Sequence, residues 1–506
     1  RKGAVVQLSR TRRHDELLSG FRHRVPGKHS LSFAADCAPP AAHVRTFFWR
    51  EPPEKRKLLG IDGLEGPRDF QRLTVDAIDV ARKELQDVGE KDPLNLVLSL
   101  DNASNELCRV ADAAELVRSV HPDEAHVSEA NEVVNSVSSF MGEVNLDVSL
   151  YDSLKRAEGS DDFASLSLEA REVLGHMRVS MESEGVHLPD DEKAECLQLL
   201  GREQELAFSI VQGQEQRRGQ ENHDGVWLST EAVKEAFGAN VSQLPRRSSP
   251  ADEVRIPTEP RWVQHLLRHA SCSKTRRAAY ESLESREDPG EQGLVELLRV
   301  RQRLAGLRGY GSWNEYAQRE SLFTHPDSVR TFLTAAWKRL RPGLLLDLQQ
   351  LSTEKEKLFG ESVLEPWDVP LLLHRCRGEH ALPTAELAPY MSYGSLIHGV
   401  EMILSRTLGL RFQLEKPDAG EVWHPTVQKY TVREGDAVLG VLYLDPFTRP
   451  GKLIQSAQFT LRGSKVLRGG DRQVPSTAIV FALPGTEGLS MTSMVTFMHE
   501  IGHALH

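Results

Sequence analysis

Apolar residues recur every three or four positions through most of the chain from about residue 67 onward, and this period restricts the fold more than any other feature. In residues 190–217, acidic side chains also crowd the start of the segment, where a helix dipole favours them. The same period predicts further helices over residues 293–306, 327–341 and 343–358, the last two separated by Pro342-Gly343. The pattern therefore predicts a mainly α fold in which the apolar stripes are packing faces.

Near the end of the chain, the helical period gives way to short runs of β-branched and aromatic residues. Turn signals such as Pro450-Gly451 separate these runs. We expect them to be strands of one small sheet, over residues 429–432, 437–445, 456–462 and 477–483. After a break, Ser490 is suited to cap a last helix that begins at Met491.

This last helix carries the pattern H-E-x-x-H as His499, Glu500 and His503. Positions i and i+4 share one helix face, about 6 Å apart along the axis. Both imidazoles can therefore bind one metal ion at ~2.0–2.1 Å. Glu500 lies about 100° round the helix from His499, so we expect it to act on a metal-bound water as a general base. The pattern predicts one Zn²⁺ ion with His499 and His503 as ligands and Glu500 as the catalytic residue.

The same pattern also occurs by chance on surface helices, where it has no function. Here uncharged residues such as Phe497 and Ile501 flank the motif, so we expect the helix to be buried all round its ligands. Gly502 costs roughly 1 kcal/mol in a helix interior, which predicts another element close to it. About 10.5 Å of helix rise separates His506 from His499, which excludes His506 as a third ligand. We expect His506 to pack or hydrogen-bond beside the site.

Charge is distributed unevenly along the chain. Residues 1–57 contain 13 Lys and Arg against 5 Asp and Glu, whereas the other 449 residues contain 49 against 68. The acidic body disfavours nucleic acid as a partner, but it does not disfavour a basic peptide. The basic, Ser-containing start is typical of a mitochondrial targeting segment or of a disordered tail, and four prolines predict a linker over residues 34–57. No apolar run approaches the roughly 18 residues of a membrane span.

Several segments together resemble the thimet-oligopeptidase-like zinc metallopeptidases. The zinc helix TFMHEIGHALH is similar nearly residue for residue, and the likeness extends over roughly residues 58–506. Other similar segments are LYLDPFTRPGK, SAQFTLRGSK, GEVWHPTVQKY and VLEPWDVP. The stretches NELCRVADAAELVRSVHPDEAH, NLDVSLYDSL and EGVHLPDDEK resemble a mitochondrial branch of this family in particular.

This resemblance implies a mainly α, two-lobed fold with a deep central channel and a small sheet beside the zinc helix. It implies a metalloendopeptidase of the mitochondrial matrix that removes an N-terminal octapeptide from imported precursors. The partner would be a peptide or an unfolded precursor N-terminus, and we expect the enzyme to be a monomer. The implied organisation is a presequence and linker over 1–57, an N-terminal helical domain over 58–250 and a catalytic domain over 251–506.

In the family, a glutamate on a following helix supplies the third zinc ligand, and no residue of this chain corresponds to it. We therefore expect the chain to be a fragment, cut within the active site, that is inactive on its own. Two alternatives stay open. One is a cytosolic oligopeptidase of the same family, and the other is a truncated protein that binds peptides without cleaving them.

Overall fold

The computed structural model describes residues 57–506 apart from a few short stretches, at 221–224, 248–251, 258–259, 285–290, 379–386, 453–454, 468, 484 and 487. The expected presequence and linker therefore lie almost wholly outside the described residues. The described chain forms two compact units, one within Arg1–His187 and Pro383–His506 and the other within Leu188–Leu382. The expected domain boundary after residue 250 stays a prediction.

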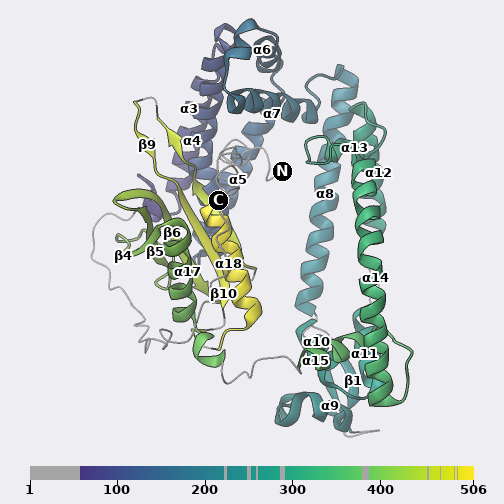
Figure 1. The fold of residues 1–506 in the computed structure, drawn as a ribbon. Coiled ribbons are helices and arrows are strands. Elements are labelled where there is room, and N and C mark those ends of the chain that lie inside the picture. Colours follow the sequence, from purple (N-terminus) through teal and green to yellow (C-terminus); the bar gives the residue numbers. More distant parts are fainter. Residues whose placement is uncertain are drawn as a thin grey trace, which may run out of the picture. The chain divides into compact units, whose positions relative to one another are not determined.

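The first unit is built on a five-stranded sheet with helices on both faces (Figure 1). Its strands are β4 (Leu410–Glu415), β5 (Gln428–Glu434), β6 (Ala437–Phe447), β7 (Ala457–Arg462) and β10 (Ser476–Leu483). Their order across the sheet is β4-β5-β6-β10-β7. Neighbouring strands are antiparallel, except that β10 runs parallel to β6. The four expected strands are confirmed as β5, β6, β7 and β10, and β4 is an addition to them.

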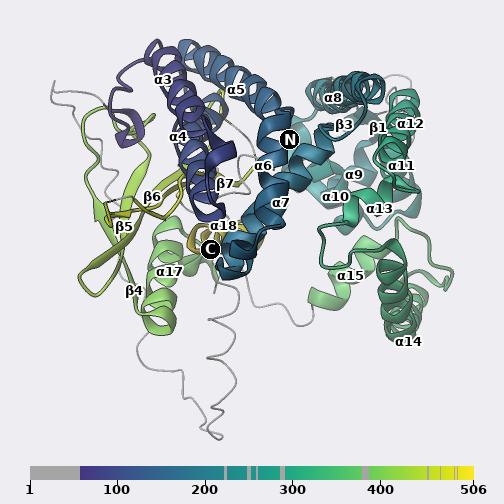
Figure 2. The same ribbon diagram turned by 90° about the horizontal axis from the view of Figure 1, so that it is seen from above.

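The helices of the first unit come from both ends of the chain. They are α3 (Asp69–Glu84), α4 (Pro93–Val120), α5 (Glu124–Asn145), α6 (Val148–Glu158), α7 (Leu168–Glu184), α17 (Tyr393–Leu408) and α18 (Met491–Leu505). Figure 2 shows α3, α4 and α5 on one side of the sheet and α17 on the other. A small separate hairpin is formed by β8 (Lys465–Val466) and β9 (Arg472–Gln473).

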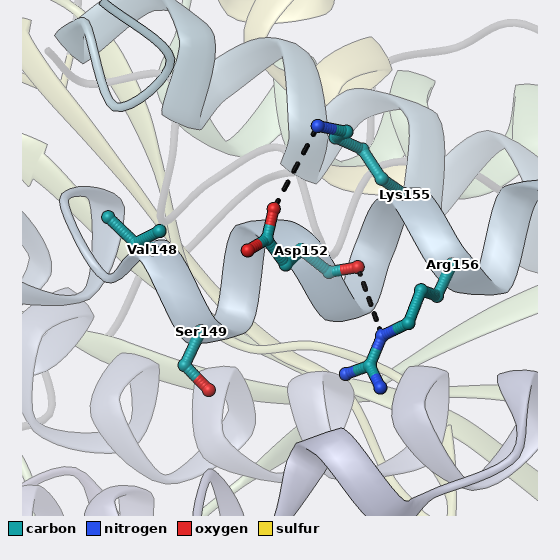
Figure 3. A pocket seen from close by; sticks show the side chains of 5 residues that line it. All are labelled: Val148, Ser149, Asp152, Lys155 and Arg156. Carbon is teal, nitrogen blue, oxygen red and sulfur yellow. Dashed lines mark hydrogen bonds and ion pairs between the residues drawn. The ribbon is translucent and has the colours of Figure 1, made fainter. Parts of the chain in front are cut away.

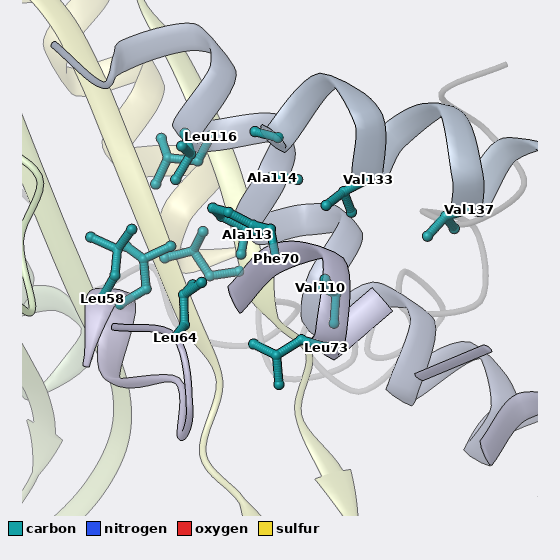
Figure 4. Packing of buried hydrophobic residues seen from close by; sticks show 14 of the residues in the cluster. Leu58, Leu64, Phe70, Leu73, Val110, Ala113, Ala114, Leu116, Val133 and Val137 are labelled. Atoms are coloured by element: carbon teal, nitrogen blue, oxygen red, sulfur yellow. The ribbon is translucent and has the colours of Figure 1, made fainter. Parts of the chain in front are cut away.

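Strand β10 contributes alternate side chains to two separate cores. Ala478 and Val480 are fully buried in the core that β10 shares with α3, α4 and α5. Figure 4 shows the part of this core that the helices supply, including Phe70 of α3. Ile479 and Phe481 are buried in the core formed with α17 and α18. Because both faces are covered, β10 reads as a continuous apolar run rather than as an alternation of apolar and polar residues. The sheet thereby fixes α18 from one side.

The second unit is mainly helical. Its helices are α8 (Asp190–Gln220), α9 (Thr230–Phe237), α10 (Pro260–His269), α11 (Ser273–Glu284), α12 (Glu291–Leu307), α13 (Trp313–Gln318), α14 (Pro326–Phe359) and α15 (Val369–Gly378). The expected helices over 190–217 and 293–306 are confirmed as α8 and α12, which run side by side (Figure 1). A three-stranded sheet has the order β1 (Gly225–Ser229), β3 (Glu253–Pro257) and β2 (Arg246–Arg247).

Helix α14 corrects two expectations. The segments 327–341 and 343–358 form one helix with Pro342 inside it, not two helices separated by Pro342-Gly343. A proline removes one hydrogen bond but does not end a helix whose neighbouring turns stay paired. In addition, most apolar side chains of α14 are exposed in the described structure, including Trp337 at 54% and Leu340 at 67%. This stripe is therefore not a packing face among the described residues.

No membrane-spanning helix is found among the described residues, because none is both long and apolar enough. This agrees with the lack of a long apolar run in the sequence.

Candidate active site

Helix α18 lies on the sheet through one apolar face. Phe497 is fully buried and stacks on Phe481 of β10, with ring centroids 4.5 Å apart and an interplanar angle of 18°. Ile501, one turn further, is buried in the same core. At the start of the helix, the Ser490 hydroxyl accepts a hydrogen bond of 3.0 Å from the Ser493 amide, so the expected cap is confirmed. These contacts fix the direction in which the rest of α18 points.

The two histidines of the motif converge as their spacing predicts. The Nε2 atoms of His499 and His503 are 3.0 Å apart, and the two rings meet nearly edge to face at 83°. Two ligands held at ~2.0–2.1 Å by a tetrahedral ion are separated by about 3.3 Å. The imidazoles therefore fit two positions of a zinc site, with little change needed in either side chain.

The surroundings of the pair differ from the expectation of burial on all sides. His499 and His503 are exposed, and so are Val495 and Met498 beside them. The expectation fails because uncharged residues are often exposed, so their presence alone does not predict burial. The expected close neighbour of Gly502 is also missing, since no described atom would lie within 4 Å of a Cβ at that position.

Glu500 is placed differently from the two histidines. Its side chain lies on the buried side of α18, between Phe497 and Ile501, and the residue is only 8% exposed. It makes no hydrogen bond or ion pair with another described residue. Its carboxylate oxygens are not among the fully buried, unpartnered atoms of the described residues, so solvent can reach them.

No third His, Cys, Asp or Glu donor converges with His499 and His503 within the described part of the chain. His506 ends the helix, where its backbone amide donates to the Gly502 carbonyl at 3.1 Å, and the residue is exposed. The described residues thus bring together two nitrogen ligands and, on the adjacent face, a carboxylate. Catalytic zinc sites usually have three protein ligands.

A buried charge network stabilises the strand next to β10. Asp445 of β6 accepts hydrogen bonds of 2.8 Å from Trp423, Arg449 and Lys452, and its carboxylate is fully buried. Burial alone raises the pKa of Asp445, but the bonds from Arg449 and the charge of Lys452 outweigh it and lower the pKa below its usual value. Segments quoted for the family resemblance, LYLDPFTRPGK and GEVWHPTVQKY, therefore meet here, on the face of the sheet that α4 covers.

A second group of metal-binding residue types was missed by the sequence reasoning. His121, Asp123 and His126 lie together where α4 passes into α5, and they are the only such group of three among the described residues. Burial and the neighbouring His126 lower the pKa of His121 to about 4, so its ring is neutral near pH 7. The spacing H-x-D-x-x-H at a helix start could have revealed this group.

The hollow in Figure 3 offers less chemistry than α18. It is lined by Val148, Ser149, Asp152, Lys155 and Arg156, all on α6. The Asp152 carboxylate is 3.8 Å from the Lys155 ammonium, and the Arg156 guanidinium donates to the Asp152 carbonyl at 3.4 Å. These are ordinary contacts between neighbouring turns of one helix. The histidine pair therefore remains the candidate active site.

The model of Peptidase family M3 matches residues 266–506, a range that includes the whole five-stranded sheet and α18. Residues 266–506 are thus similar to peptidase family M3. The expected resemblance to zinc metallopeptidases is thereby confirmed, as is the expected mainly helical fold with a small sheet. The matched range also contains His499, Glu500 and His503, whose roles remain predictions.

Comparison with curated proteins extends the similarity over most of the chain. The mitochondrial intermediate peptidase of Pongo abelii is 28% identical over 463 residues, covering 90% of this chain and 62% of that protein. The Homo sapiens protein gives the same values. The Arabidopsis thaliana protein is 27% identical over 477 residues, covering 89% and 66%. The chain is thus homologous to mitochondrial intermediate peptidases and spans about 62% of the length of the first two.

Proposed function

We propose that this chain supplies the zinc-binding helix of a mitochondrial metalloendopeptidase. In this proposal, His499 and His503 bind one Zn²⁺ ion and Glu500 is the catalytic base. The observation that carries the proposal is the 3.0 Å separation of the two Nε2 atoms on a helix within residues 266–506. A chance motif on a surface helix would not be expected inside a range that matches a peptidase family.

The proposed role of each residue follows from its position on helix α18. When bound, zinc lowers the pKa of a water molecule towards 7 and polarises the scissile carbonyl. His499 and His503 are exposed to solvent, so a peptide can approach the site from their side. Glu500 takes a proton from the attacking water and then gives it to the leaving amine. Because it follows a ligand by one residue, Glu500 would not compete for the metal and would be free to act on the water.

For the substrate, we propose the N-terminus of an imported precursor protein, from which an octapeptide is removed in the mitochondrial matrix. The names of the relatives support a mitochondrial peptidase. The basic residues 1–57 agree with this localisation. A reporter fused to residues 1–57 should be imported by isolated mitochondria. If the reporter stays outside, the alternative of a cytosolic oligopeptidase is favoured.

We further propose that residues 1–506 alone have little peptidase activity. Two neutral imidazoles without a third protein ligand hold zinc weakly, and no third donor converges with them among the described residues. A competition titration with a chromogenic chelator should therefore give a much weaker zinc affinity than is usual for a three-ligand site. Tight zinc binding together with full activity would contradict this part of the proposal. Peptide binding without cleavage would favour the non-catalytic alternative.

The catalytic assignment can be tested in a chimera. Residues 58–506 are joined to the stretches of the human relative that this chain does not match, and cleavage of a precursor peptide is measured. We expect zinc-dependent cleavage, which Glu500→Gln lowers by at least about 100-fold, in line with the usual contribution of a general base. Glu434→Gln, at an exposed strand end, is the matched control and should keep full activity. Equal activity of the Glu500→Gln and control chimeras would show that Glu500 is not the base.

A further inference from the structure

The short connection between α4 and α5 brings two imidazoles and a carboxylate together. His121 ends α4, Asp123 caps α5 and His126 lies in the first turn of α5. One ligand atom of each residue lies within 4.8 Å of the other two. The rings of His121 and His126 are stacked, with centroids 3.9 Å apart. All three residues thus come from the two helix ends and the link between them.

The hydrogen bonds of the group bring the atoms that could bind a metal close to one another. The Asp123 amide donates to Nδ1 of His121 at 3.1 Å, and Asp123 Oδ2 is 2.6 Å from Nδ1 of His126. The other carboxylate oxygen, Oδ1, accepts the Ala125 amide at 3.1 Å and so caps α5. Capping therefore occupies one oxygen of Asp123 and leaves the second with the histidines.

We propose that His121, Asp123 and His126 form a second metal site, which binds one Zn²⁺ or a similar transition-metal ion. The cation takes the place of the proton between His126 Nδ1 and Asp123 Oδ2, and the His126 ring carries its proton on Nε2 instead. His121 offers the lone pair of Nδ1, which gives up the hydrogen bond from the Asp123 amide when the metal binds. Small side-chain rotations bring the three donors to the ~2.0–2.2 Å of zinc ligands. Two imidazoles and a carboxylate suit zinc, cobalt and nickel better than calcium or magnesium.

The nearby charges permit a cation here. Arg449 lies close, since its guanidinium donates to the Val120 carbonyl at 2.7 Å. Asp445 accepts two bonds of 2.8 Å from it and offsets part of its charge, since the same carboxylate also pairs with Lys452. The negative end of the α4 dipole at His121 favours a cation, the positive end of the α5 dipole at Asp123 and His126 opposes it, and the two effects largely offset each other. Asp123 itself adds a negative charge.

Such an ion would join the ends of two long helices rather than catalyse a reaction. Metal binding to residues on separate elements stabilises the folded arrangement of those elements, because the unfolded chain lacks the site. The site is independent of the proposed peptidase function, since it uses none of the residues of α18.

The test uses the full chain with His499→Ala and His503→Ala, so that the candidate active site no longer binds metal. Co²⁺ is titrated and its visible absorption is recorded, and Zn²⁺ is titrated by calorimetry. We expect one equivalent to bind and to raise the Tm. Adding His121→Ala should weaken the affinity by at least about tenfold, as loss of ligands or of their supporting groups does.

Asp123→Ser keeps the result interpretable if a histidine variant fails to fold. Serine is a good N-cap, so this change removes the carboxylate ligand and preserves the start of α5. It should also weaken metal binding by at least about tenfold, with unchanged helix content by circular dichroism. His176→Ala, which removes a histidine 4.0 Å from the Glu172 carboxylate, should leave the titration unchanged. The proposal is overturned if the parent chain binds no metal, or if Asp123→Ser and His176→Ala bind it equally well.

Discussion

Asp445 holds two cationic side chains in the interior of the first unit. Lys452 and Asp445 are almost completely buried, and the Arg449 side chain is 10% exposed. The ammonium of Lys452 also donates to the carbonyls of Asp445 and Phe447. Each charge is therefore both paired and hydrogen-bonded, which is the condition under which buried ions are tolerated.

Asp445→Asn should destabilise the chain strongly, because it leaves Lys452 and Arg449 buried without a counter-ion. Removing one partner of a buried pair costs about 3–5 kcal/mol. Urea unfolding followed by circular dichroism measures the loss. Asp436→Asn, in the exposed turn between β5 and β6, is the matched control and should change stability by less than about 0.5 kcal/mol. Similar stabilities for the two variants would mean that the buried network contributes little.

The sequence predicts the candidate ligands well and their surroundings poorly. The spacing of His499 and His503 determines their approach, because helix geometry is local and independent of the rest of the fold. Their exposure depends on which residues of distant elements pack against α18, and no local pattern carries that information. The group of His121, Asp123 and His126 is a different case, because its three residues lie within six positions and their local spacing carried the signal.

At the scale of the helix, α18 is held by its cap and by one apolar face. Ser490→Ala removes the hydroxyl that accepts the Ser493 amide. We expect a loss of about 1 kcal/mol, the usual effect of removing an N-cap. Hydrogen exchange of the amides in the first turn of α18 should speed up first. Ser490→Asp, which restores a capping oxygen, should bring exchange back to the original rate, and a failure to do so would argue against the cap.

The two faces of α18 should respond differently to truncation. Phe497→Ala removes a fully buried ring stacked on Phe481, so we expect a loss of about 3–5 kcal/mol. Val495→Ala, on the exposed face, should cost less than about 0.5 kcal/mol. Thermal unfolding of both variants gives the comparison. Equal losses would mean that Val495 is covered in solution.

Elements with a clear period were predicted, and those whose local signals conflict were not. Strands β5, β6, β7 and β10 follow from their β-branched and aromatic residues. Strand β4 was missed because LRFQLE follows α17 directly and is too polar to stand out. In α14, Pro342 signals a break, but the helix continues through it. Local propensity is outweighed there by the hydrogen bonds of the turns on either side.

For the whole molecule, the buried aspartates predict sensitivity to acid. Burial raises the pKa of Asp445 and Asp368, but bonds from basic neighbours, Lys355 and Arg276 in the case of Asp368, lower it overall. A carboxyl with a lowered pKa in the folded state adds stability above its unfolded pKa of about 3.9. That stability is lost as the pH falls through the lower folded value.

The free energy of unfolding should therefore drop steeply below about pH 4. Urea midpoints measured from pH 7 down to pH 3 test this expectation. In Asp368→Asn the stability at pH 7 should be lower and its fall with acid shallower, because the titrating group is gone. A slope unchanged by the substitution would show that other carboxyls determine the acid response.

The two faces of β10 also affect how the chain acquires its structure during synthesis. Residues 58–140 supply most of the core around α3, α4 and α5, yet Ala478 and Val480 of that core come from near the other end of the chain. Helices α3, α4 and α5 therefore keep an uncovered apolar face until β6 and β10 have been made. Such transient surfaces favour aggregation, so this face needs protection until those strands have been made.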